Sequence, residues 1–405
     1  MKKTLALLVL GILSQCTQTD TSIDGIWRAE VPTAIGPIPF NLSFETINDT
    51  IHVFALNADE KLELDHAYYK HDSIHITMEV FDAKIVVKVS GGQMTGHYTK
   101  KLGDLEERTG TFTAKKGDTF RFSEFEESSK HNVSGKWKSI FTEPEGVKYE
   151  AIGVFEQNGN KVKGTFLTTT GDYRFLEGNV IGDSLKLSCF DGTHIFLFNA
   201  LIEDDKLVNG RFASSLLYEE TWEAVKNQNA TLPNPDELTF IKDGFGDFNF
   251  SFVNTKGEMV SLNDERFNDK VVLVQLLGSW CPNCMDESKF FVKWLKENPD
   301  KNVEIIGLAY EKSLDPAFAF PKIERMKKRF GMEYEVLLAG LYDKEEAQKT
   351  LPMLNKIISF PTTIYLDKNH KVRKVHTGFS GPGTGIYYEQ FAAKFNAFME
   401  KLTAE

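Results

Sequence analysis

The chain has 405 residues, and since a globular domain averages about 150 residues, two or three domains are expected. Its net charge of −11 at pH 7 has the wrong sign for attracting phosphate backbones, which excludes a general nucleic-acid-binding protein. The composition, 41% hydrophobic and 26% charged, is that of an ordinary globular protein, and four cysteines are too few for a disulfide-stapled scaffold.

The N-terminus has the pattern of an export signal. Two lysines precede an apolar run over residues 5–13, which is shorter than the ~20 residues that cross a bilayer as a helix. Because Ser-Gln then leads into Cys16, this end resembles a bacterial lipoprotein signal, although Gln15 is larger than the residue usual there. The resemblance implies removal of residues 1–15, a diacylglyceryl group on Cys16 and a tether over residues 16–22; an ordinary secretory signal is the alternative. We therefore expect a periplasmic protein of a Gram-negative bacterium, lipid-anchored to the inner or outer membrane.

Residues 23–226 are predicted to be rich in β-strands. Short runs of β-branched and aromatic residues alternate with Gly, Asp and Asn, as in consecutive hairpins. The region also repeats itself: residues 25–28 (GIWR) match residues 135–138 (GKWK), and two further matches follow in the same order at offsets that grow from 110 to 114 residues. We infer a duplication with halves over residues 23–127 and 128–226.

Each half contains about eight candidate strands. Strands joined by hairpins can close into a small barrel or form a sandwich, and the Gly-x-Trp opening of each half is similar to that of lipocalin-like barrels, which favours a barrel. No catalytic pattern stands out. His71 and His75 would share one face of a strand and could chelate a metal, but a solvated strand is the simpler interpretation because no third ligand is visible. Cys189 is expected to be a small buried apolar residue, and the region is interpreted as a binding or positioning module.

The pattern changes to α/β in the C-terminal part, residues 240–405. Residues 227–239 include two prolines and are predicted to be a linker. The run Val271–Leu277 is almost continuously apolar, as expected for a strand covered on both faces. The further elements expected are a strand over 303–309, helices over 321–330, 345–354 and 387–401, and a terminal hairpin formed by 362–366 and 372–377.

A Cys-x-x-Cys motif, Cys281 to Cys284, follows the first of these strands at the start of a predicted helix. Unpaired N–H groups and the dipole at a helix N-terminus favour a thiolate, and Pro282 fits the first helical position. Cys281 can therefore attack a substrate disulfide, and Cys284 can resolve the mixed disulfide. A zinc site would need two further ligands, and a purely structural disulfide would close a very short loop. A redox pair is favoured, with neither a metal nor another cofactor expected.

Glu287 lies one helical turn beyond the second cysteine. At about 100° per residue it shares a stripe with Cys284 and Phe291, opposite several lysines. Burial on that side would raise its pKa and suit it to exchange a proton with Cys284. The alternative is a partly exposed helix glutamate.

Two segments together resemble the TlpA/ResA branch of the thioredoxin superfamily. They are residues 280–287 (WCPNCMDE) and residues 360–363 (FPTT), and the resemblance covers roughly residues 246–402. It implies a cis bond before Pro361, which would place the Phe360 backbone beside the first cysteine, where an extended substrate could add as a strand. The buried acid of the family corresponds to Glu287. The residues implied in substrate binding are Trp280, Pro282, Phe360, Pro361 and Thr362.

The expected fold class is thus multidomain, a duplicated all-β region followed by a thioredoxin-like α/β domain. The leading functional hypothesis is a membrane-tethered periplasmic thiol:disulfide oxidoreductase that reduces exported proteins. The resemblance suggests cytochrome-maturation apoproteins as substrates and an integral-membrane thiol donor. Pro282-Asn283 replaces the family's usual Gly-Pro or Glu-Pro, so a disulfide isomerase or oxidase at the same site stays open, as does a binding lipoprotein in which the β repeats are the functional module. A peroxidase is disfavoured because Gly278 stands where peroxiredoxins have Thr.

Overall fold

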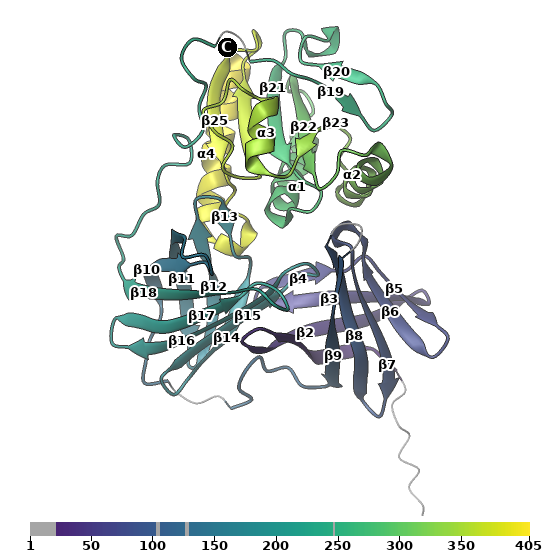
Figure 1. Cartoon of the computed structure of the whole chain (residues 1–405), viewed down its shortest axis with the longest axis vertical. Helices are drawn as coiled ribbons and strands as arrows, with labels where there is room; N and C mark the ends of the chain where they lie inside the picture. The colour runs from purple at the N-terminus through teal and green to yellow at the C-terminus, as the bar shows by residue number, and fades with distance from the viewer. Residues whose placement is uncertain (1–21, 103–105, 126–128, 246–247) are drawn as a thin grey trace, which may run out of the picture.

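The computed structural model describes residues 22–102, 106–125, 129–245 and 248–405. Cys16 and the predicted signal lie outside the described residues. Two β-sheet bodies lie side by side, and an α/β body rests across them (Figure 1). None of the described helices is long and apolar enough to cross a membrane.

The first repeat is a nine-stranded antiparallel sheet that closes into a barrel. The sheet order is β2-β1-β9-β8-β7-β6-β5-β3-β4, and the additional pairing of β2 with β3 closes the ring. A short 3-10 helix, η1 (Glu79–Phe81), interrupts the hairpins. The strands are β1 (Gly25–Thr33), β2 (Gly36–Ile47), β3 (Thr50–Asn57), β4 (Glu60–Glu63), β5 (His66–Lys70), β6 (Ser73–Met78), β7 (Ala83–Ser90), β8 (Gln93–Leu102) and β9 (Glu106–Lys116).

The second repeat has the same topology. Its order is β11-β10-β18-β17-β16-β15-β14-β12-β13, with β11 paired to β12. The barrel is thus confirmed over the sandwich, and the strand count of about eight was one short in each half because β4 and β13 are very short. The strands are β10 (Gly135–Thr142), β11 (Lys148–Asn158), β12 (Lys161–Thr168), β13 (Gly171–Asp172), β14 (Leu176–Ile181), β15 (Ser184–Phe190), β16 (Ile195–Glu203), β17 (Lys206–Ala213) and β18 (Glu219–Lys226).

The matching Gly-x-Trp segments make the same contacts in both barrels. Trp27 and Trp137 are buried in their cores. The indole Nε1 of each donates to the carbonyl oxygen four residues earlier, Ile23 and Val133 respectively, at 2.7 Å. The two glycines that start these strands have φ of 115° and 108°, a left-handed conformation that favours glycine. The duplication read from the sequence is confirmed at this level of detail.

The two barrels pack directly against each other. Phe190 of β15 stacks on Phe40 of β2 with ring centroids 4.1 Å apart. The Asn57 side chain donates to the Phe190 carbonyl at 2.9 Å and accepts from its N–H at 3.1 Å. Because these polar groups are buried and mutually satisfied, the barrels form a fixed support for the third body.

The α/β body is a seven-stranded sheet in the order β20-β19-β23-β22-β21-β24-β25. Every residue of its central strand β21 is buried, as its apolar run predicts. The elements are β19 (Ser251–Asn254), β20 (Met259–Ser261), η2 (Glu265–Phe267), β21 (Val271–Leu277), α1 (Pro282–Glu297), β22 (Val303–Glu311), α2 (Pro316–Phe330), β23 (Glu335–Leu341), α3 (Lys344–Thr350), β24 (Thr362–Leu366), β25 (Val372–Thr377), η3 (Pro382–Thr384) and α4 (Ile386–Ala404).

Three helices differ from their predicted bounds, since α4 (Ile386–Ala404) extends beyond both ends of the predicted 387–401. Helix α2 begins at Pro316 rather than at Pro321, because Asp315 caps it by accepting from the Ala317 N–H at 2.9 Å. Helix α3 ends at Thr350, four residues before the predicted end. Strand β23 was not predicted.

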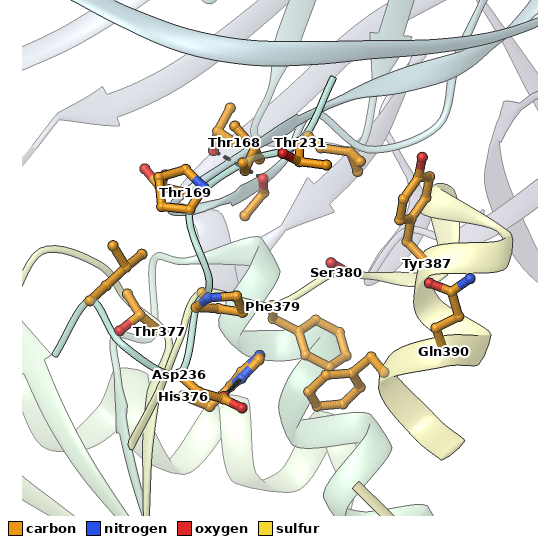
Figure 2. A pocket seen from close by; sticks show the side chains of 18 of the residues that line it. Thr168, Thr169, Thr231, Asp236, His376, Thr377, Phe379, Ser380, Tyr387 and Gln390 are labelled. Atoms are coloured by element: carbon orange, nitrogen blue, oxygen red, sulfur yellow. Dashed lines mark hydrogen bonds and ion pairs between the residues drawn. The ribbon is translucent and has the colours of Figure 1, made fainter. Parts of the chain in front are cut away.

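The predicted linker packs against the α/β sheet edge. The Thr377 N–H of β25 donates to the Pro235 carbonyl at 3.0 Å, and His376 contacts Asp236 at 2.6 Å. A cavity of about 280 Å³ lies where this segment, the β12–β13 hairpin and α4 meet. Figure 2 labels three of the residues that line it, Thr168 of β12, His376 of β25 and Tyr387 of α4.

Candidate active site

The two cysteines of the motif form a disulfide at the N-terminus of α1. Cys281 is the N-cap residue, and its sulfur accepts from the Cys284 N–H at 3.2 Å. Cys281 is 5% exposed and Cys284 is fully buried. The sulfur of Cys281 is therefore the one that a substrate can reach, and the helix N–H groups beside it favour its thiolate after reduction.

The loop before β24 lies next to this sulfur. The Phe360–Pro361 peptide bond is cis, as the family resemblance implies. The Phe360 carbonyl oxygen is 3.5 Å from the Cys281 sulfur. The side chain of Thr362 is buried, and its hydroxyl donates to the Ser359 carbonyl at 2.9 Å, which holds the loop. Of the residues expected to bind substrate, Trp280, Pro282 and Phe360 line the open cavity described below, whereas Pro361 and Thr362 lie beneath its surface.

Glu287 is fully buried beneath the cysteines. Its carboxylate accepts from Gln275 Nε2 at 2.8 Å and from Thr363 Oγ1 at 3.0 Å. The same amide nitrogen lies 3.4 Å from the Cys284 carbonyl oxygen, which places the acid below that residue. Burial raises the pKa of Glu287 to about 8, and the two hydrogen bonds offset only part of this effect. The predicted burial is confirmed, and such a group can take or give a proton near neutral pH.

A second buried acid holds the turn that leads into Cys281. Glu311, at the end of β22, is 1% exposed. It accepts from the Ser279 N–H at 2.8 Å and from the Ser279 hydroxyl at 2.7 Å. Burial raises its pKa. Sequence reasoning missed it because one acid at the end of an apolar strand carries no signal of the segment that it will contact.

The second barrel covers one side of the motif. Asn283, between the two cysteines, donates through Nδ2 to the Asp172 carbonyl of β13 at 3.3 Å. The Ser359 hydroxyl donates to the Thr170 carbonyl at 2.8 Å, and the Gly381 N–H donates to the Asp172 carboxylate at 2.7 Å. The β12–β13 hairpin thus contacts the motif, the cis-proline loop and the segment before α4.

Arg174, just after β13, joins all three bodies. It is 4% exposed. Its guanidinium pairs with Glu60 of the first barrel at 2.9 Å and with Asp286 of α1, and it lies 3.4 Å from Asp191. Although burial alone would raise the pKa of Asp191, His194 and Arg174 hold it well below its usual value. A buried arginine among three carboxylates fixes the position of α1, and hence of Cys284, relative to the barrels.

The three bodies enclose a cavity of about 740 Å³ that reaches the redox pair. The α/β body contributes Trp280 and Cys281 to its lining. The barrels contribute, among others, Phe81, Lys100, Tyr173, His194 and Phe196. Access to the exposed sulfur is therefore through a cleft with walls from both repeats, which the sequence did not indicate.

The other candidates lie away from the cleft. His75 stacks on Tyr68 in the first barrel, and His71 lies in the turn before it. Among the described residues there is no group of three or more side chains placed to hold a metal ion. Cys189 is buried as expected, and burial raises the pKa of its thiol.

Comparisons with known proteins agree with this geometry. Residues 242–389 match the family model described as Redoxin. The thioredoxin-like protein YneN of Bacillus subtilis is 27% identical over 138 residues, which is 34% of this chain and 73% of that protein. The thiol-disulfide oxidoreductase ResA of Halalkalibacterium halodurans is 27% identical over 131 residues, or 32% of this chain and 65% of that protein.

Solved structures with a similar C-terminal body include the thioredoxin domain of a thiol-disulfide oxidoreductase from Bacteroides vulgatus, with 22% identity, a TM-score of 0.28 and coverage of 38% of this chain and 99% of that one. A thiol-disulfide oxidoreductase from Bacteroides fragilis has 21% identity, a TM-score of 0.27 and coverage of 35% and 96%. By family model and curated relatives, the protein is a redox enzyme of the thiol:disulfide-exchanging class. Its C-terminal body is similar in sequence to TlpA/ResA-like proteins of the thioredoxin superfamily.

Proposed function

We propose that the protein is a periplasmic, lipid-anchored oxidoreductase that reduces disulfides of exported proteins. The observation that carries the proposal is the Cys281–Cys284 disulfide at the start of α1, with the buried Glu287 behind it and the Phe360 carbonyl in front. This arrangement supplies a nucleophile, a resolving thiol and a proton acceptor in one place.

In the reduced enzyme the Cys281 thiolate attacks one sulfur of a substrate disulfide. The substrate S–S bond breaks, a mixed disulfide forms, and the electron pair leaves on the second substrate sulfur, which takes up a proton. Glu287 then accepts the proton of the Cys284 thiol. The resulting thiolate attacks the Cys281 sulfur, releases the first substrate sulfur as a thiolate and closes the enzyme disulfide, so two electrons have passed to the substrate.

The location and the partners follow from the N-terminal pattern and the family resemblance. Cys16, lipidated after removal of residues 1–15, would hold the enzyme at the inner or outer membrane. An integral-membrane thiol donor would return the Cys281–Cys284 pair to the dithiol. Substrates would be disulfide-containing exported proteins, including cytochrome-maturation apoproteins.

Trapping tests this proposal. In a Cys284→Ser variant the mixed disulfide on Cys281 cannot be resolved, so covalent adducts with envelope proteins should accumulate and disappear on treatment with a thiol reductant. A Cys281→Ser variant is the matched control and should form none. If the Cys284→Ser variant traps nothing and the wild type does not reduce protein disulfides in vitro, the proposal is wrong.

A further inference from the structure

Four lysines line the cavity that contains Cys281: three come from three different elements of its walls, and the fourth, Lys344, lies at the exposed start of α3. Lys100 comes from β8 of the first barrel, Lys312 directly follows β22, and Lys322 belongs to α2. They lie close enough to influence one another.

Burial lowers the pKa of Lys100 to about 8; the charges of Asp191 and Asp82 oppose this shift, and the charge of Lys312 adds to it. Burial also lowers the pKa of Lys312, with Lys322 acting in the same direction and Asp82 and Glu311 against it.

Acidic groups neutralise only part of the positive charge of the lysine cluster. This cluster consists of Lys100, Lys312 and Lys322. Lys322 pairs with Asp82 of the first barrel. Lys100 donates to two neutral oxygens of Thr193, the carbonyl at 2.9 Å and the hydroxyl at 2.6 Å. In the part of the chain that the structure describes, the ammonium group of Lys312 makes neither a hydrogen bond nor an ion pair.

The other acids of the cavity are occupied or lie at its rim. The Glu311 carboxylate accepts twice from Ser279, and the Asp172 carboxylate accepts from the Gly381 N–H. Asp343 caps α3, where it accepts from the N–H groups of Glu345 and Glu346. This end of α3 is exposed, and the lining residues Lys344 and Glu345 there carry opposite charges.

Asp82 and Glu311 act on Lys312 through their charges, but their carboxylates bond to Lys322 and Ser279 instead. Among the described residues the Lys312 ammonium therefore has no direct partner inside the cleft, which favours an anionic group on what binds there.

The cleft also restricts the shape of that ligand. Cys281 is 5% exposed, and the walls around it come from both barrels as well as from Trp280 and Phe360. A volume of about 740 Å³ falls in the range of sites that enclose a compact ligand rather than of open docking faces. Walls of this kind favour the approach of an extended segment over that of a disulfide on a folded protein surface.

We infer that the cleft binds an extended peptide segment that has an acidic side chain next to its cystine, with the carboxylate on Lys312 and Lys100 and the disulfide against Cys281. This inference rests on the proposed reductase function and names its substrate class. The lysine cluster then serves specificity, while Glu287 behind the motif serves proton transfer.

The test uses two matched probes and the full-length protein. One probe is the symmetrical disulfide of a capped tetrapeptide with glutamate before the cysteine, and the other has glutamine in that place. The wild type should reduce the glutamate probe with a KM about tenfold lower, the scale of one hydrogen bond to a charged group. Lys312→Met should remove this preference by raising only the KM for the glutamate probe, and Lys100→Met should do the same. Lys206→Met, at an exposed position of the second barrel, is the matched control and should keep the preference.

Lys312→Glu is a second variant, which reverses the charge of the side chain instead of removing it. It should reverse the preference between the probes, so that the glutamine probe has the lower KM. Equal KM values for the two probes in the wild type would overturn the inference. A Lys312→Met variant that reduces both probes equally slowly would also overturn the inference. It would mean that the lysine acts on the Cys281 thiolate, and the pH profile of Cys281 alkylation would then shift. Faster reduction of a folded protein disulfide than of either peptide would also overturn it. Failure to reduce any disulfide would instead overturn the proposed function itself.

Discussion

The two barrels have the same topology and the same buried tryptophan contacts, yet they contribute differently to the redox site. In the second barrel the β12–β13 hairpin contacts the motif directly through Asp172. The corresponding β3–β4 hairpin of the first barrel contacts the α/β body at α2, where the Glu63 carbonyl accepts from Arg329 at 2.6 Å, and its Glu60 pairs with Arg174 of the second barrel. Duplication thus preserved the scaffold, while the hairpins facing the third body diverged into one wall that contacts the motif and one that supports it.

The barrel cores differ as well. The second core contains a dense cluster of rings, in which Phe141 stacks on Trp222 at 5.7 Å and Phe198 stacks on Phe212 at 4.2 Å. The first core has mostly aliphatic side chains, and it is extended by Phe190 from its neighbour. Offset and edge-to-face ring pairs add stability beyond their buried area. The barrel that contacts the Cys-x-x-Cys motif directly is accordingly the one with the more aromatic core.

The largest expected effect tests the equivalence of the barrels. Trp27→Ala and Trp137→Ala each leave a large core cavity and an unpaired carbonyl, so each should lower the unfolding free energy of its own barrel by about 4 kcal/mol. Urea unfolding followed by circular dichroism measures both. A cost in one barrel that is less than half the cost in the other would contradict the idea that the duplicated scaffold is equally important in both.

The next prediction concerns whether Arg174 only stabilises the contact between the three bodies or also positions the redox site. Arg174→Met leaves Glu60, Asp191 and Asp286 without their buried partner and should cost about 3 kcal/mol of stability. It should also slow disulfide reduction, because Asp286 lies two residues from Cys284.

The matched control for that variant is Arg121→Met. Arg121 is also buried and pairs with Glu177 at 2.7 Å between the two barrels, away from the motif. The Arg121→Met variant should lose a similar amount of unfolding free energy but reduce disulfides at the wild-type rate per folded molecule. If both variants reduce disulfides equally well, the contacts of Arg174 do not position the redox site.

Sequence reasoning reached the elements with strong local signals. The run Val271–Leu277 matches β21 residue for residue, and the helical stripe correctly predicted the burial of Glu287. Strand β23 was missed although Gly331, the left-handed C-cap of α2, separates it from the preceding helix. Its residues, 335–341, form a short apolar run that periodicity alone does not distinguish from a helix segment. The roles of Asp172 and Arg174 were beyond reach, since each depends on contacts between segments more than 100 residues apart.

A third prediction changes the redox domain alone and leaves both barrels intact. Burial raises the pKa of Glu287 from 4.5 to about 8. Between these values the folded protein holds a proton that the unfolded chain has released, so the stabilisation is complete below about pH 4.5 and decreases as the pH rises through 8. From pH 6 to pH 8 the wild type should lose about 2.5 kcal/mol from this group. Glu287→Gln should lack that loss in urea unfolding at the two pH values.

The same variant should be slow to resolve mixed disulfides, since glutamine cannot accept the Cys284 proton; a decrease of about 100-fold is expected for general-base loss. Rapid mixing of reduced enzyme with a peptide disulfide measures the step. A variant that keeps the pH dependence of stability would show that another group holds the proton, and an unchanged resolution rate would remove Glu287 from the chemistry.

The smallest expected effect concerns the one contact that distinguishes the second barrel most directly, the hydrogen bond from Asn283 to the Asp172 carbonyl. Its distance of 3.3 Å and its partly exposed donor imply a loss of only about 0.5 kcal/mol in Asn283→Ala. The hairpin should nevertheless move more freely over the motif, so iodoacetamide should alkylate the reduced Cys281 faster than in the wild type. Thr46→Ala, which removes a 2.8 Å bond to Asp24 in the first barrel, is the control of similar thermodynamic cost and should leave alkylation unchanged. Equal alkylation rates in the wild type, Asn283→Ala and Thr46→Ala would mean that the hydrogen bond to Asp172 does not restrict access to Cys281. The second barrel would then cover the motif through the position of its hairpin, and that position would be what distinguishes it from the hairpin of the first barrel.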